Sequence, residues 1–285
     1  MFGNLKQKLL HYTWDLAYFN LSNNKITEFE SGKAIIIKNP YRTKWFADPF
    51  VLSYSNGKLE LLVEEFDSNI KRGRIARLLI DTNKRIIEDC VIVLDLPTHL
   101  SFPAIYRENN VIYVTPENSA SGALFIYEYD RERDKLVNQQ LLHPEPLTDA
   151  IISKIGEKYK MYATCLPNPN GNCLYEYESD NFLGPYKKTS ELVYNRSTAR
   201  MAGYIIHEDD GKIIRPAQDC TNGYGEAVIL FEKDKELKRI APPGMFMYSG
   251  LHTFNTFGEV GVIDLKKYDY YIFVKMKDLV KRLIR

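Results

Sequence analysis

Two carboxylates, a guanidinium and an imidazole stand at corresponding places along this chain. Asp48 and Asp149 each begin a segment that continues as an apolar run, Arg200 lies two residues before another such segment, and His252 begins one more. A partly buried carboxylate can act as an acid or base or bind sugar hydroxyls, and a guanidinium binds a carboxylate or phosphate through two hydrogen bonds. If the fold gathers these residues, they predict one polar pocket for a carbohydrate.

Further polar residues extend this prediction. Arg196, Arg215, Gln218 and Asp219 surround Arg200 in the sequence, and an arginine cluster opposite carboxylates suggests an anionic or phosphorylated ligand. The alternative is that the arginines neutralise Asp48, Asp149 and Asp219 as buried pairs, and that Asp48, which precedes a proline, ends a turn. The predicted catalytic residues are Asp48, Asp149 and Asp219, and the predicted substrate-binding residues are Arg200, Arg215, Glu65, Glu117, Arg196, His252 and Gln218.

We expect no metal and no cofactor. The four cysteines, Cys90, Cys165, Cys173 and Cys220, form no CxxC pair, which argues against a zinc site and favours reduced thiols in a cytosolic protein. His252 is a lone histidine that could be structural or ligate a metal, and the structural role is favoured. Glu65 and Glu117 end corresponding segments without a motif around them, and a place on the pocket rim is the favoured alternative for both.

The elements that must position these residues repeat about every 50 residues. Each repeat starts a strand, near residues 48, 102, 149, 202 and 252, and a Gly- or Asn-containing turn and a second apolar run follow. Repeats of this length that consist of strands predict propeller blades, whose first strands meet around one axis. The sequence therefore predicts an all-β, five-bladed β-propeller with short terminal helices. A single domain covers 1–285, and segments 12–19 and 270–275 close the ring.

Composition and the chain ends narrow the function classes. The net charge of +1 gives no global case for nucleic-acid binding, and no window approaches ~18 uninterrupted apolar residues. The N-terminus lacks the pattern of a secretory signal, so we expect a cytoplasmic protein. Residues 276–285 combine an apolar helical stripe with flanking lysines and arginines, which suits contact with the inner membrane surface. The alternative is that this stripe docks on the propeller.

Several motifs occur together and in order. They are FADPF (46–50), VEEF (63–66), GRI (73–75), LSFP (100–103), TPENS (115–119), LGPY (183–186), RMAG (200–203), RPAQD (215–219), YGEA (224–227) and LHTFN (251–255). With these motifs the chain resembles the propeller found at the N-terminus of plant glucosamine inositolphosphorylceramide transferase and its bacterial stand-alone relatives. This group looks like a branch of the five-bladed clan that includes family 43 glycoside hydrolases.

The resemblance implies a carbohydrate-active enzyme of surface polysaccharide or glycolipid assembly. In the related hydrolases it implies an Asp base on blade one, a modulating Asp on blade three and a Glu acid on blade four. Asp48 and Asp149 match the first two, but Arg200, Met201 and Ala202 stand where the acid belongs. We therefore expect a glycosyltransferase that takes a phosphorylated sugar donor and a glycan or lipid-linked acceptor. The alternatives are a glycoside hydrolase with a displaced acid, supplied by Glu117, Glu226 or Asp219, and a non-catalytic glycan-binding propeller.

Overall fold

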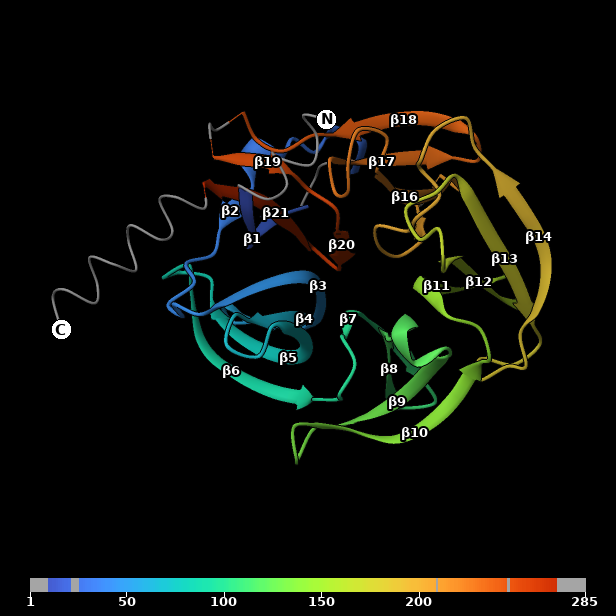
Figure 1. Cartoon of the computed structure of the whole chain (residues 1–285), viewed down its shortest axis with the longest axis horizontal. Helices are drawn as coiled ribbons and strands as arrows, with labels where there is room; N and C mark the ends of the chain where they lie inside the picture. Colours follow the sequence, from blue (N-terminus) through green and yellow to red (C-terminus); the bar gives the residue numbers. More distant parts are fainter. Residues whose placement is uncertain (1–9, 22–25, 209, 245–246, 271–285) are drawn as a thin grey trace, which may run out of the picture.

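Five antiparallel sheets stand around a common axis (Figure 1). The structure is a computed structural model that describes residues 10–21, 26–208, 210–244 and 247–270. The sheets follow one another in chain order, and in the first three the first strand lies nearest the axis. The prediction of an all-β, five-bladed propeller is confirmed.

The first four sheets are each built from consecutive strands. Blade one holds β3 (Lys44–Ser55), β4 (Lys58–Asp67), β5 (Arg72–Asp81) and β6 (Ile86–Leu94). Blade two holds β7 (Ser101–Glu108), β8 (Val111–Glu117), β9 (Leu124–Asp130) and β10 (Lys135–His143). Blade three holds β11 (Leu147–Ile155), β12 (Lys158–Cys165), β13 (Cys173–Ser179) and β14 (Lys187–Val193). Blade four holds β15 (Ile206–His207), β16 (Ile213–Asp219), β17 (Ala227–Glu232) and β18 (Lys235–Ile240).

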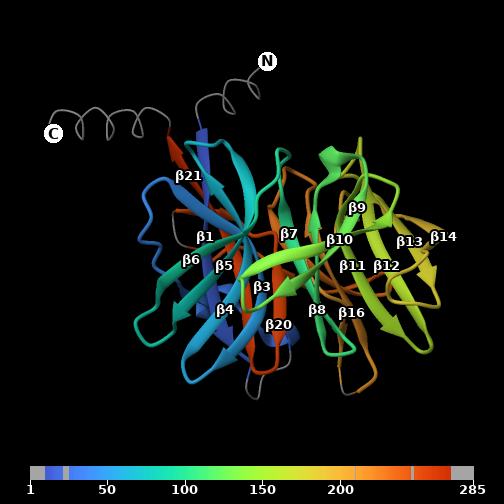
Figure 2. The same cartoon turned by 90° about the horizontal axis from the view of Figure 1, so that it is seen from below.

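The fifth sheet closes the ring by joining both ends of the described chain. It contains β19 (Tyr248–Gly250), β20 (Phe254–Phe257), β21 (Val260–Tyr270), β1 (Leu10–Asn20) and β2 (Ile35–Ile36). β1 pairs with β21 over its whole length, and the two lie side by side in Figures 1 and 2. Segment 12–19 thus lies in a closing strand as expected. Its partner is β21, which also pairs with β19 and β20 and whose last residue is the first of the expected closing segment 270–275.

Helices are few and short in the described chain. They are the 3-10 turns η1 (Ile26–Glu28), η2 (Ser31–Lys33) and η3 (Ser119–Ser121). None of the helices described is long and apolar enough to cross a bilayer. The expected terminal helices, and residues 271–275 of the second closing segment, lie outside the described residues.

Turn residues fix the hairpin registers where the sequence predicted them. Asn56 and Gly57 have φ values of 50° and 73°, and Asn109 and Asn110 have 49° and 65°. Two successive residues in the left-handed region match the right-handed twist of the flanking strands. Because glycine and asparagine enter that region at little cost, these dipeptides form the tight turns that connect β3 with β4 and β7 with β8.

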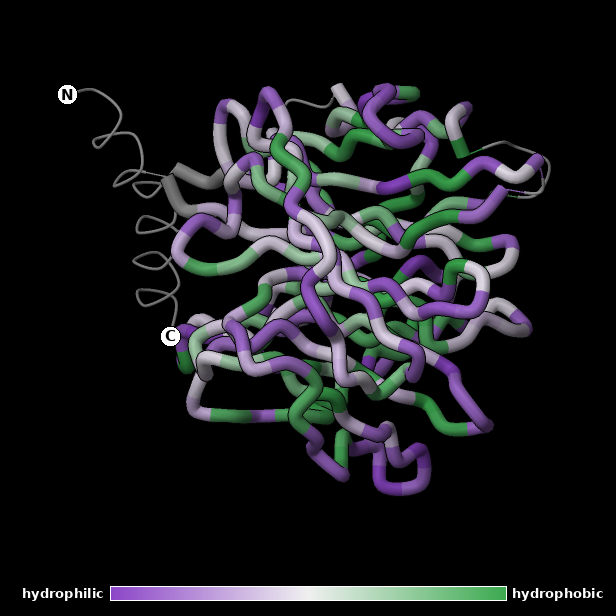
Figure 3. The backbone as a smooth tube through the Cα atoms, turned by 90° about the vertical axis from the view of Figure 1, so that its right-hand side faces the viewer, coloured by the Kyte–Doolittle hydropathy of each residue, from purple (hydrophilic) through white to green (hydrophobic). Residues whose placement is uncertain are grey.

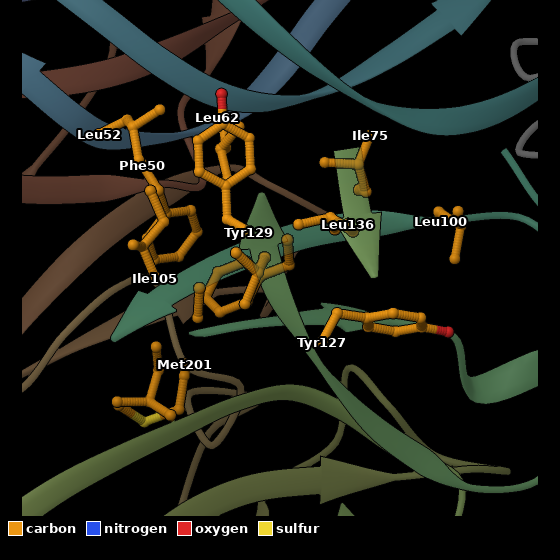
Figure 4. Packing of buried hydrophobic residues seen from close by; sticks show 14 of the residues in the cluster. Phe50, Leu52, Leu62, Ile75, Leu100, Ile105, Tyr127, Tyr129, Leu136 and Met201 are labelled. Carbon is orange, nitrogen blue, oxygen red and sulfur yellow. The ribbon is translucent and has the colours of Figure 1, made fainter. Parts of the chain in front are cut away.

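The core consists of layers between neighbouring blades. Phe50 and Leu62 of blade one are fully buried and pack in one cluster with Ile105 of blade two and Met201 (Figure 4). Burying such a side chain stabilises the fold by about 1.5–3 kcal/mol. In Figure 3 the hydrophobic segments run mainly through the interior, and several projecting turns are hydrophilic. Blades held together by such layers form a stiff frame for residues on the inner strands.

Candidate active site at the propeller axis

The same backbone irregularity places a residue on the inner strand of three blades. Asp48, Phe102 and Asp149 have φ values of 50°, 45° and 48°, and each lies where the register of its strand shifts. A left-handed conformation is uncommon for aspartate and rarer for phenylalanine, so its recurrence shows that the bulge belongs to the repeat. Bulges bend a strand and redirect a side chain, and here two of the redirected side chains are carboxylates.

Arg200 holds one half of the site together. Its Nε and Nη2 donate to Asp149 Oδ2 and Oδ1 at 2.6 and 3.0 Å, and Nη2 also donates to Glu117 Oε2 at 3.0 Å. The remaining nitrogen, Nη1, donates to Asn170 Oδ1 at 2.8 Å. Arg200 and Asp149 are both buried. This guanidinium is therefore already neutralised by protein carboxylates.

His252 organises the other half. Its Nδ1 lies 2.7 Å from Asp264 Oδ2, and its Nε2 lies 3.5 Å from Asp48 Oδ1. Asp264 also accepts the backbone N–H of Asp48 at 3.0 Å, and the Thr253 hydroxyl donates to Asp48 Oδ1 at 2.8 Å. Phe102 N–H donates to Asp48 Oδ2 at 3.1 Å. All these side chains are buried, so the network fixes the orientation of Asp48.

Aromatic rings join the two halves. Trp14 stacks on the His252 imidazole with ring centroids 3.9 Å apart. Tyr224 meets the same imidazole edge-on at 5.2 Å, and the Arg200 guanidinium carbon lies 5.3 Å from the Tyr224 ring centroid. Gly225 permits this packing because a Cβ there would lie 2.8 Å from the Trp14 ring. We call Asp48, Glu117, Asp149, Arg200, His252 and Asp264 the axis cluster.

Two carboxylates of this cluster are each stabilised in the ionised form by a neighbouring cation. Burial alone would raise the pKa of Asp149 and Asp264, but Arg200 and His252 outweigh burial and hold both pKa values below the ordinary range. Burial would likewise lower the pKa of His252, yet Asp264 and Asp48 raise it. The cluster therefore contains two ion pairs, one between His252 and Asp264 and one between Arg200 and Asp149.

The other two carboxyl groups take up protons near neutral pH. Burial raises the pKa of Asp48 to about 7 against the lowering effect of His252. Burial also raises the pKa of Glu117 to about 8, although Arg200 lowers it, and Asp149 adds to the rise through its charge and a hydrogen bond. Carboxyl groups with pKa values near the working pH can accept or donate a proton during a reaction.

Asp48, His252 and Asp264 also form a potential cation site. One ligand atom from each lies within 4.8 Å of the others. The fit is poor, because Asp48 and Asp264 already accept backbone and hydroxyl hydrogen bonds and Asp264 pairs with His252. A cation would have to replace contacts that hold this half of the cluster together, and our expectation of no metal stays a prediction.

Of two further predicted residues, Gln218 contacts the axis cluster and Glu65 does not. Gln218 is fully buried, and its Nε2 donates to Asp149 Oδ2 at 2.6 Å. Glu65 is also fully buried, but it accepts hydrogen bonds from Arg74 and pairs with Lys44 at 2.7 Å. Glu65 therefore serves an ion-pair network within blade one and does not contact the axis cluster.

The expected grouping of three further residues with Arg200 is not what the structure shows. Arg196 is exposed and pairs with Glu236 at 2.6 Å, and Asp219 pairs with Arg239 at 3.2 Å. Arg215 is buried with its guanidinium carbon 4.7 Å from the Tyr194 ring and 5.0 Å from the Phe231 ring. Arg215 Nη1 donates to the backbone carbonyls of Thr198 and Ala199 at 3.2 and 3.4 Å, so this guanidinium lies near the Arg200 backbone without contacting the axis cluster.

Sequence reasoning missed several residues of the cluster. Asp264 lies on β21, within the apolar run 260–265, and a single carboxylate inside such a run was a usable signal. Asn170 lies in a Pro- and Asn-rich loop that we interpreted only as a connection. Trp14 comes from the closing strand, and Tyr224 from a turn, so neither shares the repeat position that identified Asp48 and Asp149.

The sequence profile of the family described as glucosamine inositolphosphorylceramide transferase 1, N-terminal, matches residues 27–239. The chain belongs to this family. The match includes Asp48, Glu117, Asp149 and Arg200, whereas His252 and Asp264 lie beyond it.

Curated relatives of the family are longer proteins. Glucosamine inositolphosphorylceramide transferase 1 of Oryza sativa subsp. indica is 26% identical over 204 residues, which are 70% of this chain and 27% of the rice protein. The protein of the same name from Arabidopsis thaliana is 29% identical over 197 residues, which are 65% of this chain and 25% of its own length. The chain thus spans about a quarter of these relatives.

A solved structure shows the same fold. The α-L-arabinofuranosidase PaAbf62A from Podospora anserina, crystallised with cellotriose, superposes with a TM-score of 0.55. The superposition covers 89% of this family member and 97% of that chain at 10% sequence identity. At this identity the likeness establishes the propeller fold and leaves the reaction to be argued from the axis cluster.

Proposed function

We propose that the chain is a carbohydrate-active enzyme of surface polysaccharide or glycolipid assembly, which transfers a sugar from a phosphorylated donor to an acceptor hydroxyl. The observation that carries the proposal is Asp48, a buried carboxyl group with a pKa of about 7. Family membership supports sugar transfer, because the curated relatives are named as transferases of glucosamine to a phosphorylated ceramide. Those names also support a lipid-linked acceptor.

In this mechanism Asp48 acts as the general base. It takes the proton of the acceptor hydroxyl while the oxygen attacks the anomeric carbon of the donor. The bond from that carbon to the phosphate oxygen breaks, and the phosphate leaves with the electron pair. His252, held by Asp264, stabilises the ionised form of Asp48 before the attack. A base with a pKa near the working pH suits this role.

The donor phosphate needs a cation, and Arg200 and Arg215 are the two candidates. Arg200 lies in the axis cluster, whereas Arg215 lies outside it. Arg200 already donates to Asp149 and Glu117. Among the described residues no carboxylate lies within ion-pair distance of Arg215, and its Nη2 makes no hydrogen bond. A buried guanidinium with an unused donor is suited to an anionic ligand.

A second candidate, glycoside hydrolysis, has one specific observation in its favour. Glu117 has a pKa raised to about 8, so it is mostly protonated at neutral pH and could protonate a leaving group. It would then replace the acid that the sequence lacks on blade four. Glu226, another candidate for this role, instead pairs with Arg239 at 2.8 Å.

A substrate panel tests the proposal. The purified chain is incubated with UDP-glucose, UDP-N-acetylglucosamine or glucose 1-phosphate, with and without oligosaccharide or glycolipid acceptors, and separately with nitrophenyl glycosides. If the chain transfers sugar, nucleotide or phosphate should be released only when an acceptor is present. Release of nitrophenol would favour hydrolysis, and binding of oligosaccharide without any turnover would support a non-catalytic glycan-binding propeller.

A further inference from the structure

The loop between β12 and β13 encloses a cleft that no predicted role uses. Its volume is about 440 Å³, and residues 165–173 together with Tyr175 line it. This volume lies within the range of small-molecule sites in proteins. The cleft is on blade three, whose inner strand carries Asp149.

The loop that forms the cleft is held in place at three points. The Thr164 hydroxyl donates to Pro169 O at 2.8 Å, and Asn170 Oδ1 accepts from Arg200 at 2.8 Å. Asn172 exchanges two hydrogen bonds with the backbone of Tyr194, at 2.8 and 2.9 Å. A loop fixed in this way loses little further entropy when a ligand binds.

The same contacts connect the cleft to the axis cluster. One guanidinium, that of Arg200, contacts Asn170 in the cleft wall and Asp149 and Glu117 in the cluster. Thr164, which anchors the loop, also shares a 2.6 Å hydrogen bond with Thr148, the residue before Asp149. A molecule that contacts Asn170 in the cleft would therefore touch a direct neighbour of Arg200.

The lining chemistry indicates a neutral ligand with many hydroxyl groups. The lining contains the amides of Asn168, Asn170 and Asn172 and the Tyr175 ring, and no charged side chain. The nearest cations are engaged elsewhere, since Arg200 pairs with Asp149 and Lys188 pairs with Glu191 and covers the Tyr175 ring at 4.1 Å. Amides donate and accept at once, as vicinal sugar hydroxyls require.

We propose that this cleft is a subsite for a neutral sugar ring of the acceptor glycan. The proposal rests on the proposed function only in calling that sugar part of the acceptor, because the wall of the cleft is joined to the axis cluster through Asn170 and Arg200. Binding itself needs no turnover. The phosphorylated donor would bind elsewhere, since the cleft offers no unpaired cation.

Binding measurements on variants test the subsite. The ¹⁵N-labelled chain is titrated with cellobiose, lactose and maltose, and with glucuronic acid and glucose 1-phosphate as charged counterparts. We expect a neutral disaccharide to shift the resonances of residues 165–175. Asn168→Ala and Tyr175→Ala should each weaken that binding about tenfold, the effect of one lost hydrogen bond or ring contact. Asn69→Ala, an exposed asparagine in the β4–β5 turn, is the matched control.

The outcomes separate this proposal from the proposed function. Unchanged affinity in both cleft variants with intact melting temperatures, tighter binding of the charged sugars, or no binding of the neutral disaccharides at millimolar concentration would each overturn the subsite. Asp48→Asn should bind the disaccharide normally while losing turnover. If this variant kept full turnover and the cleft variants lost binding, the subsite would stand and the assignment of Asp48 would fall.

Discussion

Glu117 and Asp48 differ from the other carboxyl groups of the axis cluster because neither has a cation of its own. Asp149 and Asp264 each have a dedicated cation, and their pKa values are lowered. Glu117 shares Arg200 with Asp149, and Asp48 shares His252 with Asp264, so burial dominates and raises both pKa values. At the residue scale the cluster therefore consists of two ion pairs, each with a neighbouring carboxyl group that can exchange a proton. Glu117 lies beside Arg200 and Asp149, and Asp48 lies beside His252 and Asp264.

The raised pKa of Glu117 predicts a pH dependence of stability. A carboxyl group whose pKa is higher in the folded chain stabilises the fold below its unfolded pKa, and this contribution is lost as the pH rises through the folded pKa of about 8. We expect the melting temperature of the wild type to fall between pH 6 and pH 9. In Glu117→Gln the fall should be smaller, because the amide imitates the protonated acid, donating to Asp149 and accepting from Arg200.

Thermal melts across this pH range check the prediction. Glu132→Gln, at an exposed turn of blade two, is the control and should follow the wild type. Asp48 and His252 contribute in the same direction, since both pKa values are raised, so some loss remains in Glu117→Gln. A fall in Glu117→Gln as steep as in the wild type would contradict the assignment.

The repeat position alone predicted that Asp48, Asp149, Arg200 and His252 would converge, and the structure brings them together. It could not predict their partners. Asp264 and Asn170 contact the cluster from a second strand and a loop, and such contacts depend on how neighbouring blades pack. Arg215 shows the reverse case, because it lies near the Arg200 backbone as the sequence suggested, but its guanidinium packs against Tyr194 and Phe231 and does not contact the cluster.

At the scale of elements, the inner strand of blade four differs from the others. It is interrupted between the single bridge at Met201 and β15, and Gly203 lies in the gap. A Cβ on Gly203 would come within 2.1 Å of Phe254 O on the neighbouring blade. The interruption lets blades four and five approach closely at Gly203, three residues after Arg200.

Gly203→Ala should therefore destabilise the ring. We expect a melting temperature lower than that of Gly211→Ala, a turn glycine of the same blade with φ of +83° and open space around it. In the control, the alanine must adopt a left-handed conformation, which lowers the free energy of unfolding by about 1–2 kcal/mol. Each kcal/mol lost lowers the melting temperature of a domain of roughly this size by about 2–4 °C. Equal melting temperatures would show that blade five shifts freely to accept the methyl group.

Turn chemistry made most elements predictable. Asn56–Gly57 and Asn109–Asn110 identified their hairpins, and the alternating apolar runs identified the strands. The bulges at Asp48, Phe102 and Asp149 were not predictable, because none of these residues favours the left-handed region as glycine does. The sequence predicted that segments from the two chain ends close the ring, but it did not predict that β1 pairs with β21 over its whole length.

At the scale of the molecule, a lipid-linked acceptor would bring the propeller to a membrane surface. Residues 276–285, which lie outside the described residues, carry five basic side chains with Lys275 against one aspartate. Basic residues near an anionic bilayer contribute about 1 kcal/mol each. We expect the full chain to co-sediment with phosphatidylserine-containing vesicles, and a chain lacking 276–285 to bind less.

Neutral phosphatidylcholine vesicles are the control for that experiment. Negligible binding of both chains to anionic vesicles would contradict membrane contact and leave docking of the segment on the propeller. Cytoplasmic placement at the inner membrane surface stays a prediction, which fractionation of expressing cells can test.

The central claim is that the axis cluster carries out sugar chemistry, and turnover by Asp48→Asn tests it most directly. The variant should fold, because the Thr253 hydroxyl can reverse its role and accept from the new amide while the amide oxygen accepts from Phe102 N–H. With the substrate identified by the panel, and Asp180→Asn as an exposed control, we predict a loss of kcat of about 10²–10⁴-fold at an unchanged melting temperature. Wild-type turnover by a folded Asp48→Asn would contradict the account.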